Sequence, residues 1–161
     1  MHHSGDTTRR RSSGTAASLF SCALLLVLII AVFWPLLTFG FLGWDDVQAI
    51  AQNRFLTPPT LETLGRVWSD FTLWFYVPVT YTVWWLLALF AYTPASDHAA
   101  GSMAAMPFHA ANLLAHAANA VLLLHLLHRR MGTGRVAAWF GAAVFAVHPI
   151  QVEAEPKEFP H

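Results

Sequence analysis

Apolar residues gather in a few long runs along this chain, and polar residues gather between them. No charged side chain occurs from Ser12 to Trp44, and nearly every residue of Leu19–Phe39 within that stretch is apolar. About 20 helical residues span the hydrocarbon core of a bilayer. The pattern therefore predicts a membrane-spanning helix over 19–39, preceded by a polar tail over 1–18 that we expect to be disordered.

A secretory signal is the competing interpretation of the first run, because Arg9–Arg11 precede it. The run is longer than a usual signal core, and Phe33, Trp34 and Pro35 stand where a signal carries small residues before its cleavage site. We therefore expect a retained helix. Arginines near a span tend to stay on the cytoplasmic side, so Arg9–Arg11 predict a cytoplasmic amino terminus.

The segment 40–107 then forms an outer loop, in which we expect two short amphipathic helices. Thr60 follows Pro58 and Pro59 and is the expected N-cap of the second helix. The expected apolar positions are Val47, Ile50, Ala51 and Phe55 in the first helix, and Leu61, Leu64, Val67 (or Trp68) and Phe71 in the second.

A further apolar run, Val77–Tyr92, is short and rich in tryptophan and tyrosine, which prefer the membrane interface. If it crossed the membrane, the next run, Phe108–Leu127, would end outside and leave Arg129, Arg130 and Arg135 on the outer face. Arginines in short loops normally stay inside. We therefore expect an interfacial helix at 77–92 and three crossings, at 19–39, 108–128 and 136–152. A chain with four crossings is the alternative.

Composition agrees with a membrane environment. Hydrophobic residues make up 56% of the chain and charged residues 11%, whereas an ordinary soluble domain has about 25% charged residues. The net charge is zero, so nucleic acid is not an expected partner. Cys22 is the only cysteine, which excludes an intramolecular disulfide. The expected fold class is all-α: a polytopic helical membrane protein with residues 19–153 as its membrane domain and the lipid bilayer as a partner.

Four polar residues of the second crossing, His109, Asn112, His116 and Asn119, share one helix face. Polar groups at membrane depth are costly and usually face protein or a water-filled cavity. Hydrogen bonds between helices are the favoured interpretation. A substrate site, or haem ligation by His116 with a second histidine, stays open.

Two groups of polar residues flank the outer face. Asp45 and Asp46 follow the first crossing, and adjacent carboxylates are able to bind a metal, act as a general base or solvate the helix end. The last of these is the commonest role. His148 and Glu153 close the third crossing at the same face and are able to converge on the acidic pair. Spacing alone does not decide.

The motifs, taken in order, resemble the amino-terminal part of the polytopic GT-C membrane glycosyltransferases. The most similar members are the transmembrane and tetratricopeptide-repeat O-mannosyltransferases and their bacterial counterparts. The resemblance runs from about residue 39 to residue 153. It is carried by Trp44-Asp45-Asp46, Asn53, the segment 76–81, His109, the segment 112–116, Asn119-Ala120 and the segment 145–153.

This resemblance implies transfer of a sugar, mannose-like, from a polyprenyl-phosphate donor to an acceptor, either a protein hydroxyl or a glycan. The reaction would take place on the outer face of a bacterial inner membrane or the lumenal face of the endoplasmic reticulum. Asp45 matches the catalytic base or acceptor-orienting carboxylate, and Asp46 matches a supporting or divalent-metal-binding residue. The residues that the resemblance places at the substrate are Tyr76, Pro78, His109, His116, His148 and Glu153.

The chain departs from the family pattern after Glu153, where residues 154–161 diverge. We expect an amino-terminal fragment that is inactive by itself. The small residues of 136–152 favour close helix packing, and we expect them to need neighbours from outside this chain. A small non-enzymatic membrane scaffold or assembly subunit is the alternative function.

Overall fold

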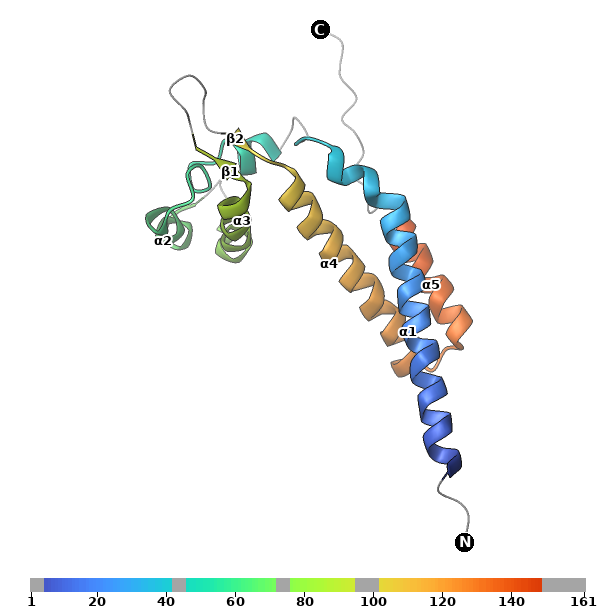
Figure 1. Cartoon of the computed structure of the whole chain (residues 1–161). Coiled ribbons are helices and arrows are strands. Elements are labelled where there is room, and N and C mark those ends of the chain that lie inside the picture. The colour runs from blue at the N-terminus through green and yellow to red at the C-terminus, as the bar shows by residue number, and fades with distance from the viewer. Residues whose placement is uncertain (1–4, 42–45, 72–75, 95–101, 149–161) are drawn as a thin grey trace. The chain divides into compact units, whose positions relative to one another are not determined.

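A computed structural model describes residues 5–41, 46–71, 76–94 and 102–148, with side chains from Ala16 onward in the first helix. The described chain is mostly helical (Figure 1). Its strands are a two-residue antiparallel pair, β1 (Tyr92–Thr93) and β2 (Ser102–Met103), which the sequence did not predict. The described residues form two compact units. The first, here called the helical unit, contains residues up to Trp34 and from Leu113 onward, and the second, here called the loop unit, contains Pro35–Asn112.

Two helices are long and apolar enough to cross a membrane. The first is α1 (Gly5–Phe33) with the 3₁₀ turn η1 (Trp34–Thr38), and its span-length part is Ala16–Thr38. The second is α4 (Met106–His125), which continues through the π-helical turn η3 (Leu126–Arg130). These helices coincide with the apolar runs at 19–39 and 108–128. The α-helical part of the first ends just before Pro35, which lacks the N–H that would continue the hydrogen-bond ladder.

The first helix begins earlier than the hydrophobic pattern indicates. The sequence predicts disorder over 1–18, but the described backbone is helical from Gly5 onward. No proline lies between Gly5 and Phe33, and extending an existing helix costs much less than nucleating a new one. The polar stretch therefore continues the helix that the apolar stretch forms.

The two shorter apolar helices are α3 (Pro78–Ala91) and α5 (Arg135–Val147), with 14 and 13 residues. At 1.5 Å per residue each is roughly 20 Å long, less than the roughly 30 Å of a bilayer core. The position of α3 agrees with the short helix expected at 77–92. The predicted crossing at 136–152 begins with α5, and its residues 149–152 lie outside the described residues.

Alanines form the buried face of α5 in the helical unit. This helix packs against α1 (Figure 1), and a Cβ added to Gly141 would lie 3.0 Å from Cδ1 of Leu127. Small side chains allow this close approach. The expectation that this face needs neighbours from outside the chain is therefore wrong. The buried alanines are Ala138, Ala142, Ala143 and Ala146.

The loop unit has one hydrophobic core, built from η2 (Val47–Ala51), the turn that follows it, α2 (Leu61–Ser69), α3 and the start of α4. Two tryptophans form hydrogen bonds that connect α2 with α3. The indole N–H of Trp85 donates to the Thr60 carbonyl at 3.0 Å. The indole N–H of Trp68 donates to Thr82 Oγ1 at 3.1 Å. The core residues are Ala49, Ile50, Phe55, Leu56, Val67, Tyr81, Trp85, Ala88, Ala91 and Phe108.

The predicted start of α2 is confirmed. Thr60 is its N-cap, and its hydroxyl and that of Thr63 each accept a hydrogen bond from the other residue's backbone N–H. The predicted apolar stripe is only partly correct, because Leu64 and Val67 pack into the core while Leu61 and Phe71 are exposed. Phe71 lies beyond the helix, which ends at Ser69.

Candidate functional site

Asp46 begins the part of the loop unit that contains η2, and Asp45 is outside the described residues. Asp46 is half-buried, immediately precedes η2 and has helical backbone angles of φ −61° and ψ −38°. Its carboxylate does not form a capping hydrogen bond to η2.

His109 ties the segment before the acidic pair to the start of α4. Its Nε2 lies 3.3 Å from the Gly40 carbonyl oxygen. A carbonyl only accepts, so Nε2 carries the proton and donates it. The Phe41 ring lies next to Gly40 and packs edge-on against Phe108, with 5.7 Å between ring centroids. These contacts fix residues 40 and 41 against the start of α4.

Asn53 organises the turn that follows η2. It is 5% exposed and is the one buried polar residue in the part of the chain that the structure describes. Its Nδ2 donates to the Ala49 carbonyl at 3.0 Å, and its Oδ1 accepts from the Phe55 backbone N–H at 2.8 Å. Burial raises the pKa of the Tyr81 hydroxyl, and a side-chain hydrogen bond with Asn53 opposes that rise. Asn53 therefore joins η2, the turn after it and α3.

Tyr76 and Pro78 both have structural roles in the loop unit. The Tyr76 hydroxyl donates to the Trp68 carbonyl at 3.0 Å, beside the carboxyl end of α2. Pro78 is the first residue of α3, a position where its missing N–H costs no hydrogen bond. A substrate-binding role for either residue stays a prediction.

His116 joins α4 to α5 in the helical unit. Its Nε2–H donates at 2.9 Å to the carbonyl of Ala146, in the last turn of α5. Carbonyls there have no partner within their own helix. The ring also stacks on Phe145 and meets the edge of Phe33. This is the hydrogen bond between helices that the sequence favoured, and it occupies the ring nitrogen that haem ligation would need.

The remaining predicted site residues are His148 and Glu153. His148 is the exposed C-cap of α5, and Glu153 lies outside the described residues. Asp46 and His109 belong to the loop unit, whereas His148 belongs to the helical unit, so convergence of His148 and Glu153 on the acidic pair stays a prediction. Within the described residues no three His, Cys, Asp or Glu side chains gather into a metal site. The metal-binding role of Asp46 also stays a prediction.

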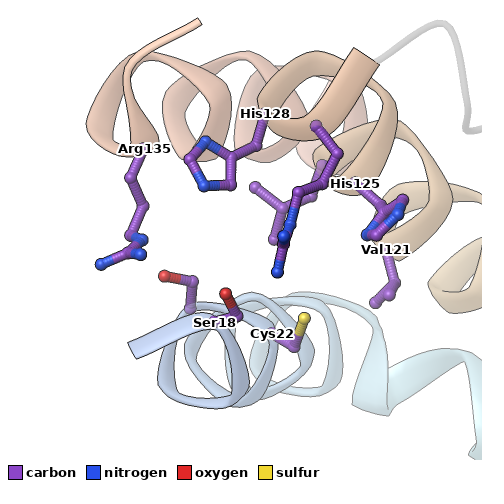
Figure 2. A pocket seen from close by; sticks show the side chains of 9 residues that line it. Ser18, Cys22, Val121, His125, His128 and Arg135 are labelled. Atoms are coloured by element: carbon purple, nitrogen blue, oxygen red, sulfur yellow. The ribbon is translucent and has the colours of Figure 1, made fainter. Parts of the chain in front are cut away.

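A small, partly open pocket of about 80 Å³ lies within the helical unit. Figure 2 shows Arg135 and His128 extending from one wall toward Ser18 and Cys22 of α1 on the other. The sequence did not predict this site, because the positions of the arginines along the chain indicate topology but not which helices they meet. The lining residues are Ser18, Ser21, Cys22, Val121, Leu124, His125, His128, Arg129 and Arg135.

Comparison of the chain with known protein families, characterised proteins and solved structures finds no match. The GT-C resemblance therefore rests on the motifs and their order. Because one fold hosts many functions, function has to be argued from the chemistry of the sites.

Proposed function

We propose that this chain is an integral membrane protein that forms the amino-terminal part of a GT-C-like glycosyltransferase. The order of its elements carries the proposal. A span-length helix is followed by an acidic pair, then by a compact unit of short helices, and then by a second span-length helix. The motifs that resemble the glycosyltransferases lie along this same order.

Outward-facing apolar side chains support membrane embedding. Only 17% of the most apolar window of the first span-length helix is buried, and only 11% of that of the second. The central helix of a soluble protein would be mostly buried, and soluble monomers rarely expose apolar surface of this extent. Exposed residues of these helices include Leu19, Phe20, Val27, Ile30, Leu114 and Leu122.

The proposed topology has a cytoplasmic amino terminus and three crossings. The arginines near η3 support it, whereas helix length does not separate α3 from α5, since with 14 and 13 residues both are shorter than the bilayer core. With α3 at the interface, Arg129, Arg130 and Arg135 lie in a cytoplasmic turn, as arginines in short loops usually do. Residues 40–107 then face the outside or the lumen.

The proposed reaction moves a sugar from polyprenyl phosphate to an acceptor hydroxyl. Asp45 takes the hydroxyl proton, the acceptor oxygen bonds to the sugar's anomeric carbon, and the bond from that carbon to phosphate oxygen breaks, so polyprenyl phosphate leaves. Asp46 would support Asp45 or hold a divalent metal ion, which would supply charge stabilisation for the leaving group. A general base must lie within hydrogen-bond reach of its substrate. The contacts of His109 and Asn53, which order the segments that precede and follow the pair in the sequence, support such positioning.

The replacement Asp45→Asn tests this role. It removes the base but keeps the side-chain size, and we expect transfer to fall by about 10²–10⁴-fold. Transfer is measured in membranes of cells that express the complete gene, with radiolabelled polyprenyl-phosphate mannose and a protein acceptor. Asp70→Asn is the matched control, since Asp70 is an acidic residue of the same unit that ends α2. Unchanged transfer by the Asp45 variant would exclude the proposed mechanism.

Two asparagines favour the alternative role of an assembly subunit. Asn112 and Asn119 are exposed on α4, a helix long enough to span. Polar groups at membrane depth usually face protein, so this face suits another transmembrane helix. The assay above separates the two functions, because an assembly subunit shows no transfer in either the native or the variant form.

A further inference from the structure

The pocket of the helical unit gathers arginines and histidines, and among the described residues no carboxylate lines it. Arg129, Arg135, His125 and His128 line it together with Ser18 and Ser21, and the Ser21 hydroxyl already donates to the Ala17 carbonyl at 2.9 Å. No Asp or Glu occurs in the sequence from His98 through Val152. Arginine guanidinium groups are hydrogen-bond donors suited to phosphate oxygens. The lining therefore has the chemistry of an anion site.

A tight turn between η3 and α5 brings these groups together. Gly132 has a φ of +68°, a left-handed conformation that favours glycine. The Met131 N–H donates to the Leu126 carbonyl at 3.1 Å, and the Thr133 N–H donates to that of Leu127 at 3.2 Å. The chain thus reverses between Arg129 and Arg135, which places both arginines at one pocket.

The turn also orients His128. Its Nδ1 lies 3.1 Å from the Thr133 carbonyl oxygen, so Nδ1 carries the proton and donates it. In the neutral ring the other nitrogen, Nε2, is an acceptor, so the donors that an anion would meet are the arginines. In Figure 2 the ring points from its helix toward Ser18 of α1. The pocket thus combines an oriented imidazole with the guanidinium groups of Arg129 and Arg135.

Exposed apolar side chains are close in sequence to the pocket residues on all three helices. Phe20 and Leu24 are exposed next to Ser21 and Cys22 on α1. Leu122 and Leu126 are exposed beside His125, and Val136 follows Arg135 with 70% of its surface exposed. A free anion would not contact these apolar side chains, whereas the acyl chains of a bound lipid would pack along them.

We propose that this pocket binds the phosphate of an anionic phospholipid, with Arg129 and Arg135 as the anchoring donors. Basic pockets between transmembrane helices on the cytoplasmic side are suited to such headgroups. The inference rests on the membrane embedding that the proposed function includes, and not on the transferase activity. Membrane embedding is checked separately by whether the chain stays in the membrane fraction after washing with alkaline carbonate.

Native mass spectrometry of the full chain in mild detergent tests the proposal, with phosphatidylglycerol and phosphatidylcholine as probes. We expect preferential binding of phosphatidylglycerol, because the choline cation opposes the arginines. Arg129→Gln or Arg135→Gln should weaken that binding by about tenfold, the loss of one charge-assisted hydrogen bond. Arg130→Gln is the matched control: it removes the same charge from the same turn, and Arg130 does not line the pocket. All three arginines are exposed, so these changes should leave the fold intact, which circular dichroism checks.

Three results would overturn the proposal. Equal binding of the two lipids would exclude recognition of the anionic headgroup. An equal effect of Arg130→Gln and Arg129→Gln would show general attraction by surface charge. Displacement of phosphatidylglycerol by millimolar inorganic phosphate would assign the site to a free anion, since the acyl chains would then contribute nothing.

Discussion

Several side chains that are candidate site residues in the sequence form hydrogen bonds to the backbone in the fold. His116 donates to the carbonyl of Ala146, and Tyr76 donates to that of Trp68. Backbone carbonyls near the carboxyl ends of helices need such donors, so polar residues near them are readily recruited. Asn53 shows the same behaviour most strongly, because its side chain both donates to and accepts from the backbone.

Asn53→Ala should lower the free energy of unfolding of the loop unit by about 1–3 kcal/mol, because it leaves the buried Phe55 N–H and Ala49 carbonyl without their partner. Thermal unfolding in mild detergent, followed by circular dichroism, measures this change. Gln52→Ala is the control, since Gln52 is adjacent and exposed. Equal melting temperatures for the two variants would show that the turn does not depend on Asn53.

The ends and faces of the helices follow from different causes. Local chemistry sets several ends: Thr60 caps α2, Pro78 begins α3 and Gly132 turns the chain after η3. The buried face of α5, in contrast, depends on its neighbour. Its alanines are spaced so that they line one side of the helix, and α1 packs against it.

Ala142→Leu should destabilise the packing of α5. Ala142 is fully buried, and extra methylene groups in a close-packed interior cost about 1–3 kcal/mol. Resistance of the helical signal to added sodium dodecyl sulfate measures the effect. Val144→Leu is the matched control on the same helix, because Val144 is exposed. If both variants resist the detergent like the native chain, α5 does not pack through its alanine face.

At the scale of the whole molecule, the amount of exposed apolar surface argues for a membrane, and the lengths of the helices bear on the number of crossings. Two helices have span length, and the two shorter apolar helices have 14 and 13 residues. Both α3 and α5 are shorter than the bilayer core, so helix length treats them alike. The arginines near η3 favour three crossings over four, because parity depends on whether α3 crosses.

Cysteine labelling tests this topology in a chain whose Cys22 is replaced by alanine. Ser102→Cys should react with a membrane-impermeant maleimide added to intact cells, and Met131→Cys, near Thr133, should react only after permeabilisation. Both side chains are exposed in the structure, so protection would report the membrane barrier and not burial. The opposite pattern would establish four crossings and make α3 a span.

The sequence by itself determined the long apolar helices, the short helix at 77–92 and the cap at Thr60. These features depend on the length of apolar runs and on residues within one or two helical turns of each other, which can be read directly along the chain. The start of α1 at Gly5 was missed because composition does not show how far a helix extends once it has formed. Tertiary structure alone decided the contact of Asn53 with Tyr81, the partner of His116, the neighbour of the α5 alanines and the pocket at Arg129 and Arg135. Each of these depends on residues that folding brings together from separate segments, and no local pattern specifies which segments will meet.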